Sequence, residues 1–151
     1  MDLTWELVHH RALTARQTYE MLRLRGIVFV DEQQVPAEME IDGVDLAGET
    51  HHLFGWLDGA LLAYARVLEP DQHGASHLGR VVVARDARGG TGTELVRRGV
   101  VACEELWPSQ PIMLGAQNHL RAFYGRHGFE PVGEIYDEAG IPHIDMVRPP
   151  A

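Results

Sequence analysis

The glycine-rich turn Arg88–Thr93, with the sequence Arg-Gly-Gly-Thr-Gly-Thr, is the segment whose backbone could do chemistry. It lies between an apolar run typical of a strand and a run with helical spacing. Glycines let a chain turn sharply and approach a ligand closely, and the free N–H groups at a helix start form an anion site. The pattern indicates a phosphate or pyrophosphate site whose donors are drawn from a short set of residues: Arg88, Gly89, Gly90, Thr91, Gly92 and Thr93. A purely conformational use of these glycines is the open alternative.

Two standard nucleotide motifs do not fit this turn. It lacks the Lys-Ser/Thr pair that closes a Walker A loop. Leu95 stands where the dinucleotide-binding fingerprint has its third glycine. An ordinary P-loop or a Rossmann site is therefore excluded.

The elements that must position this turn follow from periodicity, capping and turn signals. Thr14 and Gln17 fit a capping box that opens a helix running to about Phe29, and Asp58-Gly59 is a strong hairpin signal. A helix over 94–106, ended by Pro108, connects two strands that must then run parallel and splay apart to admit a ligand. The remaining elements are a first strand at 5–8, strands at 53–68 and 78–83, a strand at 112–114, a helix at 118–127 ended by Gly128, and strands at 131–136 and 142–147. The order along the chain is therefore strand, helix, three strands, helix, strand, helix, two strands. We expect an α/β (α+β) fold with a seven-stranded, mixed, mostly antiparallel sheet and helices on both faces.

Composition places the chain among ordinary globular proteins. Its 151 residues, 45% apolar and 23% charged, predict a single domain spanning 1–151 with one hydrophobic core. The net charge of −9 disfavours nucleic acid and anionic lipid and favours cationic small molecules. One cysteine, Cys103, rules out an internal disulfide, and neither a leader peptide nor a long apolar run is visible. We expect a cytoplasmic protein with no membrane partner.

Three separated groups of motifs carry a family resemblance. The glycine turn resembles the acetyl-CoA pyrophosphate loop of the GNAT superfamily, Arg/Gln-x-x-Gly-x-Gly/Ala. The stretches 22–33 with 42–46, and 115–117 through 123–129 and 140–144, are similar to the ElaA-type subfamily of GNAT proteins. The loop departs in one respect: with Gly90 and Gly92 in the two glycine positions, Ala87 stands where Arg or Gln is expected, and with Arg88 in the first position the loop is one residue short before Leu95.

The resemblance implies an N-acetyltransferase that uses acetyl-CoA as cosubstrate, without a metal, and transfers the acetyl group directly to a primary amine. It places Tyr124 beside the CoA sulfur as the general acid and Asn118 near the pantetheine arm. It also implies that the backbone of Val81 and Val83 pairs with that arm and supplies N–H groups to the oxyanion. For Tyr124 the alternative role is a core aromatic beside the packing residue Phe123, and for Asn118 a helix N-cap.

The general base stays open among His51, His52, Glu32, His143 and a water chain, since a histidine titrates near neutrality but can equally be structural. We expect a small-molecule or peptide amine as acceptor, and a second copy of the chain, forming a homodimer, is a further candidate partner. Two other functions remain: a non-catalytic acyl-CoA sensor, and a phosphate-binding protein unrelated to CoA. An intact Tyr124 favours the enzyme.

Overall fold

Seven strands form one mixed sheet in the computed structural model, which describes residues 2–151. The strand order is β1-β2-β3-β4-β5-β7-β6. The strands are β1 (Thr4–His9), β2 (His51–Leu57), β3 (Ala60–Leu68), β4 (Ser76–Val83), β5 (Ile112–Gln117), β6 (Glu130–Glu138) and β7 (Ile141–Arg148). Neighbours pair antiparallel, apart from β4 and β5, which pair parallel. The expected seven-stranded, mostly antiparallel sheet is confirmed.

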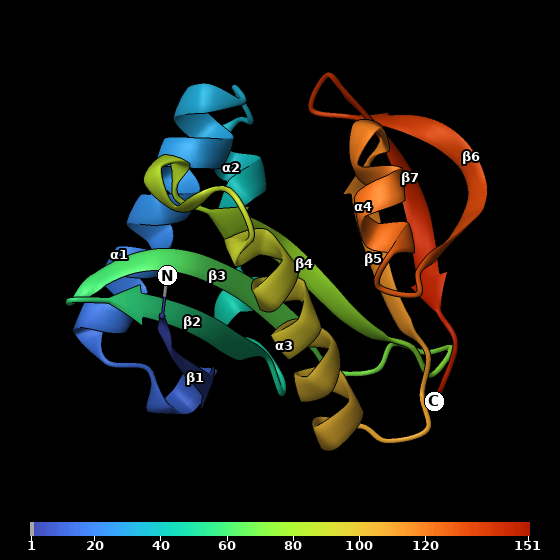
Figure 1. The fold of residues 1–151 in the computed structure, drawn as a ribbon, viewed down its shortest axis with the longest axis horizontal. Coiled ribbons are helices and arrows are strands. Elements are labelled where there is room, and N and C mark those ends of the chain that lie inside the picture. The colour runs from blue at the N-terminus through green and yellow to red at the C-terminus, as the bar shows by residue number, and fades with distance from the viewer. Residues whose placement is uncertain (1) are drawn as a thin grey trace.

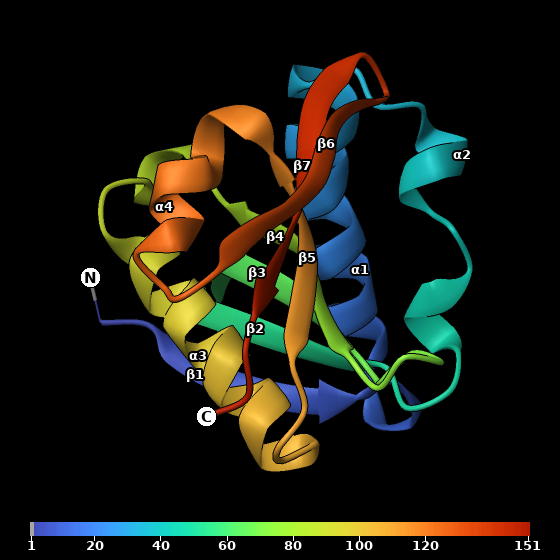
Figure 2. The same cartoon turned by 90° about the vertical axis from the view of Figure 1, so that its right-hand side faces the viewer.

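Helices cover both faces of this sheet, as expected (Figures 1 and 2). They are α1 (Ala15–Arg25), α2 (Ala37–Glu40), α3 (Thr91–Leu106) and α4 (Arg121–Gly125). Strand β3 separates two cores because its successive side chains point to opposite faces. Ala63 and Ala65 belong to the core shared with α3, whereas Tyr64 between them belongs to the core shared with α1. The close approach of α3 to β4 needs Gly99, where an added Cβ would lie 2.7 Å from Leu78 Cδ1.

The capping box predicted at Thr14 is confirmed. Thr14 Oγ1 accepts from the Gln17 N–H at 3.1 Å, and Gln17 Oε1 accepts from the Thr14 N–H at 2.9 Å. The helix was expected to run to about Phe29, but α1 ends at Arg25 and continues as a π-helical segment over Gly26–Glu32. Such wider turns occur often at functional sites, and here the turn delivers Phe29 to the cleft described below.

The hairpin predicted at Asp58-Gly59 joins β2 to β3. Both residues have positive φ, 50° and 81°, which is the conformation of the tight turns that match strand twist. The C-terminal hairpin between β6 and β7 is likewise present. The helix expected over 118–127 is shorter: a 3-10 turn over Asn118–Leu120 precedes α4, which ends at Gly125.

Candidate active site

Strands β4 and β5 are the parallel pair that diverges. They pair only at Ser76 with Ile112 and at His77 with Met113. Beyond this point β4 carries a bulge against β3, where Arg80 takes a φ of 49° that is rare for a non-glycine residue. The backbone of β4 that faces β5 therefore has no strand partner there, which is the arrangement that an extended ligand rich in amides can complete. The predicted parallel, splayed pair is confirmed.

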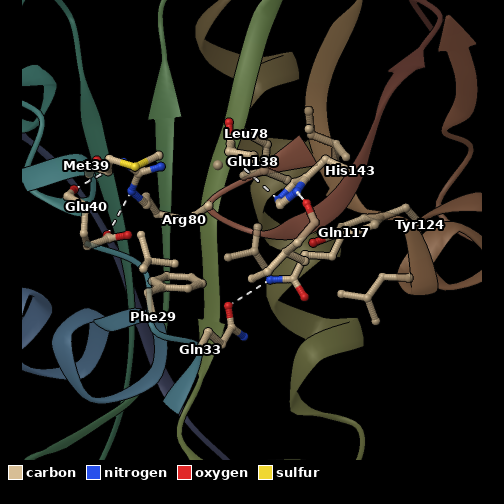
Figure 3. A pocket seen from close by; sticks show the side chains of 18 residues that line it. Phe29, Gln33, Met39, Glu40, Leu78, Arg80, Gln117, Tyr124, Glu138 and His143 are labelled. Atoms are coloured by element: carbon tan, nitrogen blue, oxygen red, sulfur yellow. Dashed lines mark hydrogen bonds and ion pairs between the residues drawn. The ribbon is translucent and has the colours of Figure 1, made fainter. Parts of the chain in front are cut away.

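A cleft of about 190 Å³ lies along this divergence. Figure 3 shows its side chains converging from both strands, from the π-helical segment, from α4 and from the β6–β7 hairpin. Its polar lining comes from six residues, one after the π-helical segment and one each on α2, β4, β5, β6 and β7: Gln33, Glu40, Arg80, Gln117, Glu138 and His143. Gln33 Oε1 accepts from Gln117 Nε2 at 2.9 Å, so a side-chain hydrogen bond joins the residue after the π-helical segment to β5.

The glycine turn leads into α3 earlier than expected. The sequence predicted a helix from Glu94, but α3 begins at Thr91, with Gly90 as its N-cap and no capping side chain. The Glu94 N–H is the one that reaches the Gly90 carbonyl, at 3.3 Å. The N–H groups of Thr91, Gly92 and Thr93 thus occupy the helix positions that have no intrahelical partner, where an anion binds favourably.

Two glycines of this turn need to be glycines. Gly89 and Gly90 have φ of 115° and 105°, and an added Cβ at either would meet no atom within 4 Å. The turn is therefore an open cradle, not a packed corner. An added Cβ at Gly92 would lie 3.7 Å from Phe123 Cζ and 4.0 Å from Val83 Cγ2, so the cradle lies beside α4 and the end of β4.

Arg88 is engaged within the protein. Its Nη2 lies 3.3 Å from Glu32 Oε1, and its Nε donates to the Val83 carbonyl at 3.3 Å. Arg85 pairs with the same carboxylate at 3.1 Å. Glu32, one of the four candidate bases, is thus neutralised by two arginines at the C-terminal end of β4.

Tyr124 is buried in α4, with 7% of its surface exposed, and lines the cleft. Its ring packs edge-on against Phe123 and Phe129, with centroids 5.1 and 6.2 Å away. Its hydroxyl makes no hydrogen bond within the described part of the chain. Burial raises the pKa of Tyr124 to about 12, so the hydroxyl keeps its proton at neutral pH and can act as an acid. A role in packing the core and a role as the general acid are therefore compatible for Tyr124.

The other residues expected beside the pantetheine arm lie on the elements that form the cleft. Val81 lines the cleft, and Val83 is half-buried at the end of β4. Asn118 follows β5, and its Oδ1 accepts from Arg121 at 3.5 Å. It is not a helix N-cap: Gln117 holds that position in the 3-10 turn and no side chain caps it.

The candidate histidines separate by location. His52 is fully buried away from the cleft: its Nε2 donates to the Asp45 carbonyl at 2.9 Å and its Nδ1 accepts from the Tyr64 hydroxyl at 2.6 Å. Burial lowers the pKa of His52 to about 4. His51 packs against Trp107 with centroids 6.0 Å apart, outside the cleft. His143, on β7, lines the cleft.

A buried ionic network, to which the sequence had given no role, forms one wall of the site. Arg25, with no exposed surface, pairs through Nε with Glu40 and through Nη1 with Asp45, each at 2.7 Å. Arg80 in turn pairs with Glu40 at 2.9 Å and Arg66 with Asp45 at 3.1 Å. The network ties α1 and the segment 37–46 to strands β3 and β4. The available signal was that Arg25 shares a helix face with apolar residues three and four positions away, Val28 and Met21.

Metal-binding clusters and membrane-spanning helices are both absent from residues 2–151. No three His, Cys, Asp or Glu side chains of this range are placed to hold a metal ion. No helix in the same range is both long and apolar enough to cross a membrane.

Comparisons with known proteins agree with this geometry. The acetyltransferase (GNAT) domain model matches residues 11–148. Protein ElaA of Escherichia coli (strain K12) is 44% identical over 148 residues, which are 97% of this chain and 96% of that protein. The crystal structure of an acyl-CoA N-acyltransferase from Pseudomonas aeruginosa superimposes with a TM-score of 0.92 at 50% identity, covering 97% of this chain and 99% of that one. The crystal structure of Escherichia coli ElaA gives 0.92 at 43% identity, with the same coverage.

Proposed function

The chain belongs to the acetyltransferase (GNAT) domain family and is an ElaA-like acyltransferase, and from this premise we propose that it transfers an acetyl group from acetyl-CoA directly to a primary amine in a ternary complex. The observation that carries the proposal is the divergence of β4 from β5 beyond His77 and Met113, with Tyr124 buried along it and the open end of α3 beside it.

The residues present fit an acyl-CoA. The cradle of Gly89 and Gly90 leaves room above the free N–H groups of α3, which suits a pyrophosphate. The unpaired edge of β4, including Val81 and Val83, suits the two amides of a pantetheine arm, which would add to the sheet as a short strand does. CoA supplies the activated acyl group, so the protein has to position the reactants and move protons.

Acetyl transfer to an amine sets three tasks: an ammonium must lose a proton, the developing oxyanion must be stabilised, and the thiolate must be protonated. Tyr124 is suited to protonate the thiolate, since its hydroxyl is protonated, points into the cleft and has no other protein partner among the described residues. Backbone N–H groups near the end of β4, around Val83, are suited to stabilise the oxyanion. Asn118 follows β5 and is suited to contact the pantetheine arm.

The acceptor is a small-molecule or peptide amine that enters between segment 37–46 and the β6–β7 hairpin. Segment 37–46 contributes Met39 and Glu40 to the cleft, and the hairpin contributes Glu138 and Ile141. The carboxylate of Glu40 is already paired with arginines, whereas Glu138 has a side chain 55% exposed. Together with the net charge of −9, this favours a cationic amine.

The test is thiol release from acetyl-CoA across a panel of primary amines that includes amino acids, polyamines, amino sugars and short peptides with free N-termini. Acetyl-CoA is compared with longer acyl-CoA thioesters at equal concentration. We expect amine-dependent thiol release that is fastest with the acetyl group. Stabilisation of the fold by acetyl-CoA without thiol release on any amine would contradict the proposal and indicate an acyl-CoA sensor.

A further inference from the structure

His143 shares the cleft with Tyr124, and its hydrogen bonds fix which ring nitrogen is free. Its Nδ1 lies 2.7 Å from the carbonyl oxygen of Ile141. A carbonyl oxygen only accepts, so Nδ1 carries the hydrogen and Nε2 of the neutral ring carries the lone pair. The ring is held in this orientation by stacking on Tyr136 of the neighbouring strand, with centroids 5.9 Å apart.

The Nε2 atom faces a carboxylate that would stabilise a positive charge on the ring. Glu138 Oε2 lies 3.4 Å from Nε2. A lone pair and a carboxylate oxygen cannot hydrogen-bond to each other, so the contact becomes favourable only when the imidazole gains a proton. Tyr136 on β6 stacks on the ring, and the other titratable or charged groups that line the same cleft include Tyr124 on α4 and the Arg80–Glu40 pair from β4 and α2.

Resting on the acetyl-transfer function proposed above, we infer that His143 is the catalytic base that removes the proton from the ammonium group of the acceptor, with Glu138 positioned to stabilise the imidazolium. Among the candidate bases, it is the one that lines the cleft with an unshared lone pair. His52 has both nitrogens occupied in the core, and Glu32 is held by Arg85 and Arg88.

His143 and Tyr124 together account for every proton that moves in the reaction. The acceptor R–NH3⁺ gives one proton to His143 Nε2, and the resulting amine attacks the thioester carbonyl carbon. As the new C–N bond forms and the C–S bond breaks, Tyr124 gives its proton to the departing sulfur and receives the second proton from the amine nitrogen. The products are R–NH–CO–CH3 and CoA-SH, and the imidazolium returns its proton to solvent.

The experiment compares His143→Gln with wild type in the thiol-release assay, using the best alkylamine of the panel, as a function of pH. We expect kcat/KM to fall by about 10²-fold or more at neutral pH. The loss should shrink as pH rises toward the acceptor's own pKa of about 10, where the amine is already neutral in solution. His143→Ala should regain activity with added imidazole.

The matched control is His51→Gln, a histidine outside the cleft, for which we expect wild-type rates at every pH. Stabilisation by acetyl-CoA verifies that each variant folds. A loss in His143→Gln that is equal at all pH values, with no imidazole rescue of His143→Ala, would make His143 a structural residue and overturn the inference. So would wild-type activity in His143→Gln, or a loss found only in Glu138→Gln. Absence of thiol release from the wild-type protein would instead refute the proposed function.

Discussion

Arg25 donates from Nη1 to Asp45 Oδ1 across 2.7 Å in the interior, although 20 residues separate them in the chain. Asp45 also accepts from Arg66 Nη1 at 3.1 Å, so one carboxylate serves two buried guanidinium groups. Burial alone would raise the pKa of Asp45, but the hydrogen bond and charge of Arg25, aided by Arg66, lower it instead. The carboxylate of Asp45 therefore stays charged in the folded protein, and its ion pairs hold the segment after α2 against the sheet.

Asp45→Ala should be strongly destabilising, because it leaves the buried charges of Arg25 and Arg66 without their shared partner. We expect the free energy of unfolding to fall by about 3–5 kcal/mol. Urea denaturation followed by circular dichroism measures this change. The control is Glu94→Ala, which removes the exposed pair with Arg97 and should cost at most about 1 kcal/mol. Equal losses of unfolding free energy in the two variants would contradict the conclusion that the buried ion pairs of Asp45 stabilise the fold.

Acid should destabilise the protein in two pH windows. Burial lowers the pKa of His52 from 6.5 to about 4, so the neutral ring is favoured in the folded state. Its contribution, on the order of 3 kcal/mol, is complete above pH 6.5 and is lost as pH falls toward 4. Burial would raise the pKa of Asp42, but hydrogen bonds from Arg66 and the Val44 N–H outweigh burial and hold that pKa at about 2. The stability that the charged Asp42 contributes is lost between about pH 4 and pH 2.

Urea denaturation at a series of pH values checks these windows. His52→Gln should weaken the dependence between pH 6.5 and 4, to which His127 also contributes, and leave the lower window in place. Asp42→Asn should weaken the dependence in the lower window, to which Asp45 also contributes, and leave the upper window in place. Stability of the wild type that stays constant from pH 7 to pH 4 would contradict a buried neutral His52.

Local signals predicted most of the fold. The Thr14 capping box and the Asp58-Gly59 turn each act over a few residues, the strand–helix–strand crossover follows from the order of three consecutive elements, and all three are present. The π-helical segment at 26–32 was not predicted, because a wider helical turn has no marked residue pattern. The early start of α3 at Thr91 was missed because the glycines were assigned to the loop as a group.

The candidate site was predictable in part. The glycine cradle and Tyr124 follow from sequence order and family resemblance, and both are placed beside the diverging strands. The partners of His143 were not predictable, because Glu138 and Ile141 reach it through the β6–β7 hairpin register. The ion-pair partners of Arg25 were equally hidden, since residues distant in sequence meet there only in the folded chain.

Gly90→Val should abolish cofactor binding while the fold survives. Gly90 has a φ of 105°, which a β-branched residue does not tolerate, so the cradle above α3 would change its path. For the wild type, acetyl-CoA at 100 times its Kd should raise the melting temperature by roughly 5–10 °C, and the variant should show no rise. Gly125→Ala is the control, because an added Cβ there meets no atom within 4 Å and φ is not positive.

Pantetheine without the nucleotide separates the phosphate cradle from the strand edge. We expect it to stabilise the wild type much less than acetyl-CoA does, because it cannot reach the N–H groups of α3. Equal stabilisation by the two ligands, or an unchanged effect of acetyl-CoA on Gly90→Val, would show that the cradle does not bind the pyrophosphate.

Tyr124→Phe should lower the rate of acetyl transfer while leaving binding intact. The substitution keeps the ring that packs against Phe123 and Phe129 and removes only the hydroxyl. We expect kcat to fall about 10²-fold, with the melting temperature and its rise with acetyl-CoA little changed. Since the pKa of Tyr124 is about 12, the wild-type rate should not decline through loss of the tyrosine proton below about pH 11. Thiol release under single-turnover conditions measures the chemical step directly, and an unchanged rate there would mean that the thiolate departs without a proton from Tyr124.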